Sequence, residues 1–153
     1  MNAPIVRGML AGFLATIALS VLMVLKAAMG MMPAMNAIKM LTAMSHQILG
    51  TPASPLVGWV IHLLIGTVLW GFLFSLIHDH LPGGDVAKGL VFGTAAWLLM
   101  MILVMPMAGA GLFGLHIGLG APIATLVLHW VYGAVLGLAY KRLSADAPGL
   151  QNS

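Results

Sequence analysis

The stretch PIATLVLHWVYGAVLG (122–137) is an apolar run that holds one histidine, His129, near its centre. It belongs to a longer uncharged segment, because no Asp, Glu, Lys or Arg lies between Lys88 and Lys141. A helix that crosses a bilayer needs about 20 mostly apolar residues, so this segment has room for two spans. The sequence therefore predicts a fold of membrane-spanning helices. His129 lies within one of these helices, so its imidazole needs a hydrogen-bond partner, a metal, a cofactor or water there.

The composition places the whole chain in a bilayer. Of its 153 residues, 61% are hydrophobic and only 6% are charged, whereas a soluble domain carries about 25% charged residues. The net charge of +3 comes from Lys and Arg residues that flank apolar segments, which indicates lipid headgroups rather than nucleic acid as the partner. The chain has no cysteine, which excludes disulfides and thiolate metal sites. No catalytic triad, carboxylate pair or phosphate-binding glycine loop occurs at a suitable spacing, so we predict that the chain is not an enzyme.

Hydropathy predicts a single all-α integral membrane domain over residues 1–153, with four transmembrane helices in a compact bundle. The turn HDHLPGGD (78–85) ends the second helix, because Pro82 and the following glycines cannot continue it. After the first span, apolar residues recur at helical spacing opposite polar ones, which predicts an amphipathic helix at the membrane interface. The predicted ranges are about 6–30, 56–78, 88–108 and 119–141 for the spans, about 34–49 for the interfacial helix and 142–153 for a cytoplasmic tail.

Basic residues set the predicted orientation. With four spans, both termini lie on one side of the membrane. Lys39 lies on the opposite side, and Lys26 near the end of the first span can extend toward that opposite side. Because Lys and Arg gather on the cytoplasmic side, both termini are predicted to be cytoplasmic in a bacterial inner-membrane protein. The basic residues on the side of the termini are Arg7, Lys88, Lys141 and Arg142.

The two halves of the chain resemble each other. RGMLAG (7–12) and KGLVFG (88–93) open the first and third spans, and Met-Pro follows or ends each of these spans. PLVGWVIHLLIG (55–66) and PIATLVLHWVYG (122–133) share proline, histidine and glycine at the same offsets. This pattern predicts a tandem duplication of a two-helix hairpin, with both copies in the same orientation.

Glycines spaced one turn apart predict how the spans pack. Such glycines let helix backbones approach closely, which matters in lipid because apolar side chains gain nothing by leaving it. The same faces could also bind membrane-protein partners or a second copy of the chain. The glycines assigned to helix packing are Gly8, Gly12, Gly66, Gly89, Gly93, Gly133 and Gly137.

His62 and His129 are the first candidates for a binding site. Each follows its proline by seven residues, so a symmetric bundle places both imidazoles at a similar depth. Two facing imidazoles are the axial ligands that haem b needs, and they also suit copper or zinc. The alternative is that each histidine simply bonds to a hydroxyl or backbone carbonyl on a helix, and we favour this alternative. We therefore predict no resident cofactor, with haem b or copper on this pair as the competing hypothesis.

Methionines supply a second candidate site. They cluster in GMMPAMNAIKMLTAMSH (30–46) and in MMILVMPM (100–107), and thioethers together with histidine favour Cu(I). Methionine is also an ordinary flexible filler of apolar surface, which explains several of these residues without a metal. The candidate copper ligands are Met32, Met35, His46, Met105 and Met107. A third group, His78-Asp79-His80, is interpreted as the C-terminal cap of the second span.

The segments RGMLAGFLAT (7–16), KGLVFGTAAWLLMM (88–101), MPMAGAGLFG (105–114) and TLVLHWVYGAVLG (125–137) resemble a family of small bacterial four-span membrane proteins of unknown function. The resemblance covers nearly the whole chain and implies a bacterial inner-membrane protein, without implying any activity or cofactor. We predict a non-catalytic structural or accessory subunit of a membrane complex. The alternative is a redox or metal-handling protein that binds haem b or copper through His62 and His129.

Overall fold

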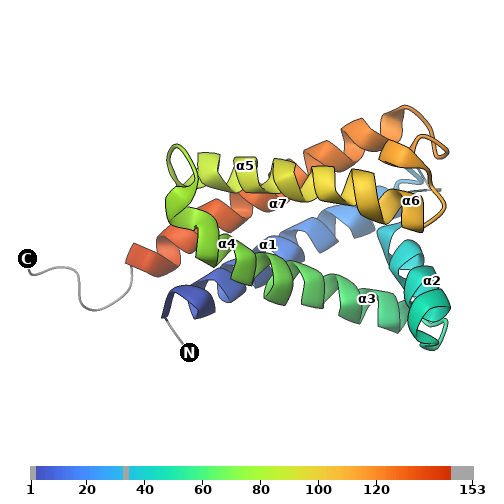
Figure 1. The fold of residues 1–153 in the computed structure, drawn as a ribbon, viewed down its shortest axis with the longest axis horizontal. Coiled ribbons are helices and arrows are strands. Elements are labelled where there is room, and N and C mark those ends of the chain that lie inside the picture. The colour runs from blue at the N-terminus through green and yellow to red at the C-terminus, as the bar shows by residue number, and fades with distance from the viewer. Residues whose placement is uncertain (1–2, 33–34, 146–153) are drawn as a thin grey trace, which may run out of the picture.

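The computed structural model describes residues 3–32 and 35–145, and these residues fold into an all-α bundle with four helical spans, as predicted (Figure 1). Each span is long and apolar enough to cross a membrane. The spans are α1 (Ala3–Ala28); α3 (Pro55–Leu64) with η1 (Ile65–Trp70), α4 (Gly71–Ile77) and η2 (His78–His80); α5 (Asp85–Leu99) with η3 (Met100–Val104) and α6 (Met105–Met107); and α7 (Gly120–Ala145).

The α1 span packs between the second span and the fourth span, so it contacts both halves of the chain. On one side it packs against η1 and α4, and on the other side against α7, which in turn packs against α5. Figure 1 shows the start of α1, the end of α7 and the 78–85 turn at one end, which we call the terminal end. The opposite end, which holds α2 (Ala37–Leu49) and residues 108–119, is the distal end.

The α2 helix begins three residues later than predicted because Asn36 caps it: the Asn36 side chain accepts a hydrogen bond from the Lys39 amide at 3.0 Å. Residue 34 lies outside the described residues. Gly50 ends the helix in a left-handed conformation with φ of 66°. A Cβ at Gly58 would touch the side chain of Ile38, so this glycine is what lets α2 lie closely against α3.

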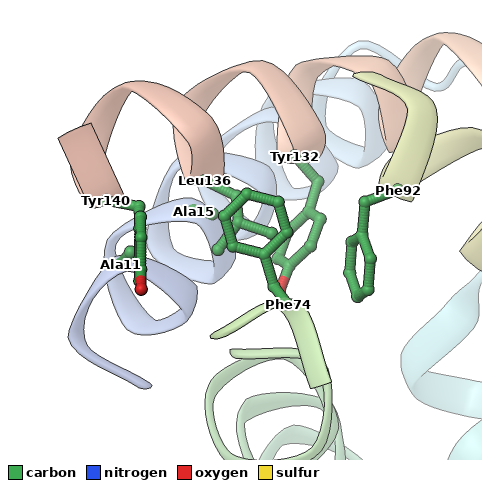
Figure 2. Close-up of a cluster of buried hydrophobic side chains, with 7 residues drawn as sticks. All are labelled: Ala11, Ala15, Phe74, Phe92, Tyr132, Leu136 and Tyr140. Carbon is green, nitrogen blue, oxygen red and sulfur yellow. The ribbon is translucent and has the colours of Figure 1, made fainter. Parts of the chain in front are cut away.

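The main core is aromatic and draws on all four spans (Figure 2). The fully buried Phe74 ring contacts Phe92 and Tyr140 edge-on, with ring centroids 5.2 and 5.5 Å apart. Leu136 of α7 and Ala15 of α1 are fully buried beside these rings. The core therefore lies toward the terminal end, where spans two and three meet through the short turn between them.

Two spans contain π-helical segments that the sequence analysis did not predict. One segment, η1, covers Ile65–Trp70 in the second span, and the other, η3, covers Met100–Val104 in the third. A π-helix closes its hydrogen bonds over five residues instead of four, so its turn is wider and accommodates an additional residue. The first and fourth spans, α1 and α7, are assigned as α-helix throughout.

Candidate functional site

The glycines of the first two spans lie against each other. A Cβ at Gly12 would lie 2.7 Å from the Gly66 carbonyl oxygen, and a Cβ at Gly8 would overlap the Gly71 carbonyl. Because these neighbours are backbone atoms, they cannot move aside as a side chain could. The α1–η1–α4 contact is therefore a backbone-to-backbone approach of the kind that small residues permit in membranes.

The third and fourth spans make a matching contact. A Cβ at Gly89 would overlap the Gly133 carbonyl oxygen, and a Cβ at Gly93 would lie 3.4 Å from the Gly133 Cα. A Cβ at Gly137 would in turn overlap the Asp85 carbonyl. The glycine faces are thus occupied within the chain's own bundle. A membrane partner, if one binds, must contact other surfaces.

His62 donates a hydrogen bond to the first span. Its Nε2 lies 3.2 Å from the Ser20 hydroxyl oxygen, and this hydroxyl donates its own proton to the Thr16 carbonyl at 2.7 Å. Since the Ser20 proton is already used, the Ser20 oxygen accepts and His62 carries its proton on Nε2. The lone pair of a neutral His62 ring then lies on Nδ1.

His129 is held in the opposite tautomer. Its Nδ1 lies 2.8 Å from the Thr125 carbonyl oxygen, which can only accept, so the proton is on Nδ1 and the lone pair is on Nε2. A ring nitrogen that donates to a backbone carbonyl is the usual arrangement of a metal-ligating histidine. His62 and His129 thus have different neighbours and expose different ring nitrogens. Haem or metal binding by the pair stays the untested competing hypothesis.

Further polar contacts join the spans around these histidines. The buried Tyr132 hydroxyl donates to the Gly66 carbonyl at 2.7 Å, which ties α7 to the π-helical segment η1. The Trp97 indole nitrogen lies 3.1 Å from the Thr125 hydroxyl oxygen, tying α5 to α7. Within the described residues, the Thr67 hydroxyl is the single fully buried side-chain oxygen or nitrogen without a partner.

The methionines proposed as copper ligands differ widely in burial. Met105 is buried, with 2% of its surface exposed, whereas Met107 two residues later is 61% exposed. Met32 packs near Gly120 at the start of α7. Met35 is buried, and its carbonyl oxygen accepts a hydrogen bond from the Lys26 ammonium at 2.6 Å. The Lys26 side chain therefore binds to the chain's own backbone.

His46, the imidazole of the same proposed set, is exposed on α2. Its Nδ1 lies 2.6 Å from the Thr51 carbonyl oxygen, so it donates there and closes the loop after the helix. Among residues 3–32 and 35–145, no three His, Cys, Asp or Glu side chains form a group that could hold a metal ion.

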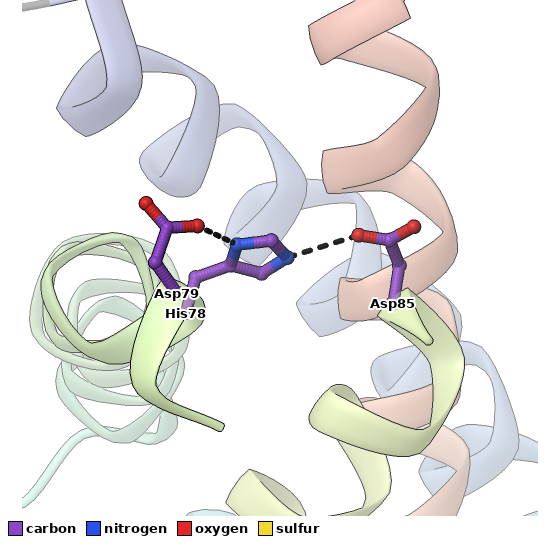
Figure 3. Close-up of polar contacts among 3 residues, drawn as sticks. All are labelled: His78, Asp79 and Asp85. Atoms are coloured by element: carbon purple, nitrogen blue, oxygen red, sulfur yellow. Dashed lines mark hydrogen bonds and ion pairs between the residues drawn. The ribbon is translucent and has the colours of Figure 1, made fainter. Parts of the chain in front are cut away.

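At the terminal end, His78 connects two aspartates (Figure 3). Its Nδ1 lies 2.9 Å from Asp79 Oδ1, and its Nε2 lies 3.0 Å from Asp85 Oδ1. Ionised carboxylates only accept, so both contacts are hydrogen bonds when the imidazole carries both protons. The ring is buried against Tyr140, with centroids 4.6 Å apart, and against Phe74 at 5.4 Å. His78 therefore clamps the turn between spans two and three, beyond the capping role predicted for it.

Two residues that complete this clamp, Asp85 and Tyr140, were not among the residues predicted from the sequence. Asp85 follows His78 by seven residues across the Pro-Gly-Gly turn, and Tyr140 is brought in by α7. The Pro-Gly-Gly turn between His78-Asp79 and Asp85 was the available signal for Asp85, because a tight turn brings its two ends close together. No local pattern could have indicated Tyr140, because its contact with His78 depends on how α7 crosses the bundle.

The two carboxylates of the clamp are expected to differ in their interaction free energy with His78. The Asp85 side chain is 29% exposed and Asp79 is 92% exposed, so water competes for Asp79 much more strongly. In double-mutant cycles with alanine, the coupling of His78 to Asp85 is expected to reach about 1 kcal/mol or more, and its coupling to Asp79 to be smaller. Unfolding by SDS titration, followed by circular dichroism, measures both. Equal coupling energies would contradict the assignment of Asp85 as the main partner.

A family model described as "Family of unknown function (DUF6789)" matches residues 2–150. No curated protein and no solved structure matched the chain.

Proposed function

Since the chain belongs to this family of unknown function, we propose a role from its geometry: a non-catalytic, multi-pass inner-membrane protein that is a structural or accessory subunit of a membrane complex. One observation carries the proposal. Several polar side chains within the spans form hydrogen bonds to another span, as in the Tyr132–Gly66 and His62–Ser20 contacts. Such bonds hold helices together in lipid.

The charge distribution supports an orientation with both termini in the cytoplasm. Arg7 and Lys88 lie at the terminal end, where Lys141 and Arg142 of α7 are also found. The distal end has Lys39, exposed on α2, and Lys26, whose ammonium is bonded to the Met35 carbonyl. The excess of basic residues at the terminal end favours its placement on the cytoplasmic side.

The sequence repeat supports an origin by duplication of a hairpin, and in both halves glycines of the two spans lie against each other. The register of the contact differs by one helical turn: the Gly66 carbonyl oxygen faces Gly12, whereas the Gly133 carbonyl oxygen faces Gly89, which the repeat pairs with Gly8. We therefore propose that each half of the chain is one copy of an ancestral two-span unit.

The π-helical segment η1 accounts for a difference in length between the second and fourth spans. The second span reads GTVLWG (66–71) where the fourth reads GAVLG (133–137), so Trp70 is an additional residue between the two glycines. A wider π turn absorbs this residue and keeps Gly66 and Gly71 facing α1. The fourth span, with one residue fewer, achieves the same spacing as regular α-helix.

Site-specific photo-crosslinking in living bacteria tests the accessory role. A photoreactive side chain is placed at one lipid-facing position on each span, and at Leu136 or Met101 as matched buried controls with 0% exposure. The expected result is a crosslink to the same membrane protein from one or two adjacent spans, recovered in the inner-membrane fraction, and none from the controls. The exposed positions are Phe13, Leu64, Leu98 and Leu138, which are 40–54% exposed.

The pattern of crosslinks decides the outcome. A partner that binds a defined face gives protein adducts from that face alone, and its identity is the same from each position on it. Adducts with lipid alone from all four spans would contradict the accessory role. Adducts with many unrelated proteins from every span would contradict it as well, because random collisions do not distinguish faces.

A further inference from the structure

The distal end contains a hollow of about 270 Å³ between α2 and the connection that precedes α7. Two of its lining residues carry a side-chain donor atom for a metal: Met40 from α2 and His116 from the connection. The remaining lining is small or aliphatic, from Ala108, Gly109, Ala110 and Ile117. The hollow therefore brings together a thioether and an imidazole from the two halves of the chain.

The imidazole of His116 is oriented for binding. Its Nδ1 lies 3.2 Å from the Gly109 carbonyl oxygen, which can only accept, so the proton is on Nδ1 and the lone pair is on Nε2. Metal-ligating histidines characteristically donate their other ring nitrogen to such a carbonyl. The ring rests on Gly111, where a Cβ would lie 2.9 Å from Nε2, and Gly111 has a φ of 74°. A side chain at position 111 would thus displace the imidazole.

Thioethers are concentrated around this hollow. Met40 packs, together with Met100, against a small core that contains the buried Met101 and Met105. Thioether sulfur is a soft ligand that selects Cu(I), whereas Zn²⁺ and Mg²⁺ sites are built from thiolate, imidazole or oxygen ligands. One accessible thioether with one neutral imidazole, backed by further methionines, matches the chemistry of a Cu(I) site.

We propose that this hollow binds one Cu(I) ion, with the Met40 thioether and the His116 Nε2 as ligands. The ion joins α2 to the 108–119 connection and so links the two halves at the distal end. This site differs from the methionine set named in the sequence analysis, which includes neither Met40 nor His116. It also differs from the His62 and His129 pair inside the spans.

Competition with a chromogenic Cu(I) chelator, on the purified full chain in detergent under anaerobic reducing conditions, tests the proposal. The expected result is one Cu(I) per chain, with affinity lowered about tenfold or more in Met40→Leu and in His116→Asn. Gly111→Ala keeps both donors but displaces the ring, so it is expected to weaken binding as well. Ag(I), a redox-inert ion of similar softness, is expected to give the same ranking of variants.

Matched controls separate this site from the other candidates. Met107→Leu, His46→Asn and His129→Asn are expected to bind Cu(I) as the natural sequence does. Circular dichroism and the melting temperature confirm folding of each variant, which Met40→Leu should retain because it conserves side-chain volume. The proposal is overturned if no stoichiometric Cu(I) binds. Binding that survives Met40→Leu and His116→Asn, or that is lost in the controls instead, overturns it equally.

Discussion

Replacing Gly133 by alanine is expected to destabilise the bundle by about 1–3 kcal/mol or more, the usual cost of forcing atoms into a filled interface. A Cβ at Gly133 would overlap the carbonyl oxygen of Gly89 and lie 2.8 Å from its carbonyl carbon, so α5 and α7 must separate to admit it. Separation along this contact also disturbs the neighbouring approach of Gly93. The free energy of unfolding in SDS, followed by circular dichroism, is the measurement.

Gly120→Ala in the same helix is the control, because its Cβ would meet only the end of Met32 at 3.5 Å, an ordinary contact distance. In helices alanine is more favourable than glycine by about 1 kcal/mol, so this control is expected to leave stability unchanged or raise it. The two substitutions therefore have opposite expected signs. A similar effect from both would show that the close approach of Gly133 and Gly89 does not limit stability.

Deleting Leu69 is expected to leave the bundle folded, with a change of about 1 kcal/mol or less, within the range of substitutions away from packed contacts. The deletion removes one residue from η1, which then becomes regular α-helix with the Gly-x-x-x-Gly spacing seen at Gly133 and Gly137. Trp70 stays next to Gly71 and keeps its edge-on contact with Phe92. Leu69 itself is 46% exposed, so little packing is lost.

Deleting Ala134 from α7 is the matched control and is expected to abolish the fold. No additional residue exists there, so the deletion rotates everything after it by about 100° relative to what precedes it. Gly137 and Tyr140 then leave the faces on which they are buried, at a cost of about 4–5 kcal/mol or more. Yield of monodisperse protein and SDS unfolding measure both deletions. Equal tolerance or equal loss would contradict the proposed origin of the π segment.

The general fold is predictable from this sequence because each span carries its own evidence. Apolar length, the charges at the ends and the Pro-Gly-Gly turn at 82–84 identify the helices independently of tertiary contacts. The order of the spans within the bundle, in contrast, cannot be predicted from local sequence patterns. That α1 lies between η1 and α7 follows from the surfaces of all the helices together, and no local pattern specifies it.

The candidate sites likewise combine features that the sequence shows with contacts that only the structure identifies. The offsets of His62 and His129 are visible in the sequence, but their tautomers depend on Ser20 and on the Thr125 carbonyl, which only the structure identifies. The methionine clusters are visible too. Which methionine shares a hollow with a histidine depends on a connection of irregular backbone, where Phe113 and several glycines have positive φ. Hydrophobic periodicity carries no information about such a segment.

The packing of α1 against α7 has a consequence for how the protein is made. The small buried residues of α1, Ala11 and Ala15, belong to the core that α7 completes, yet 91 residues of chain (29–119) separate the two helices. If the spans are inserted in chain order, the face of α1 that packs against α7 therefore stays exposed to lipid until the fourth span is inserted. Long-range pairing of this kind is intrinsically slow. During synthesis the first hairpin can form through its glycines, but the bundle stays open along α1 until α7 enters the membrane.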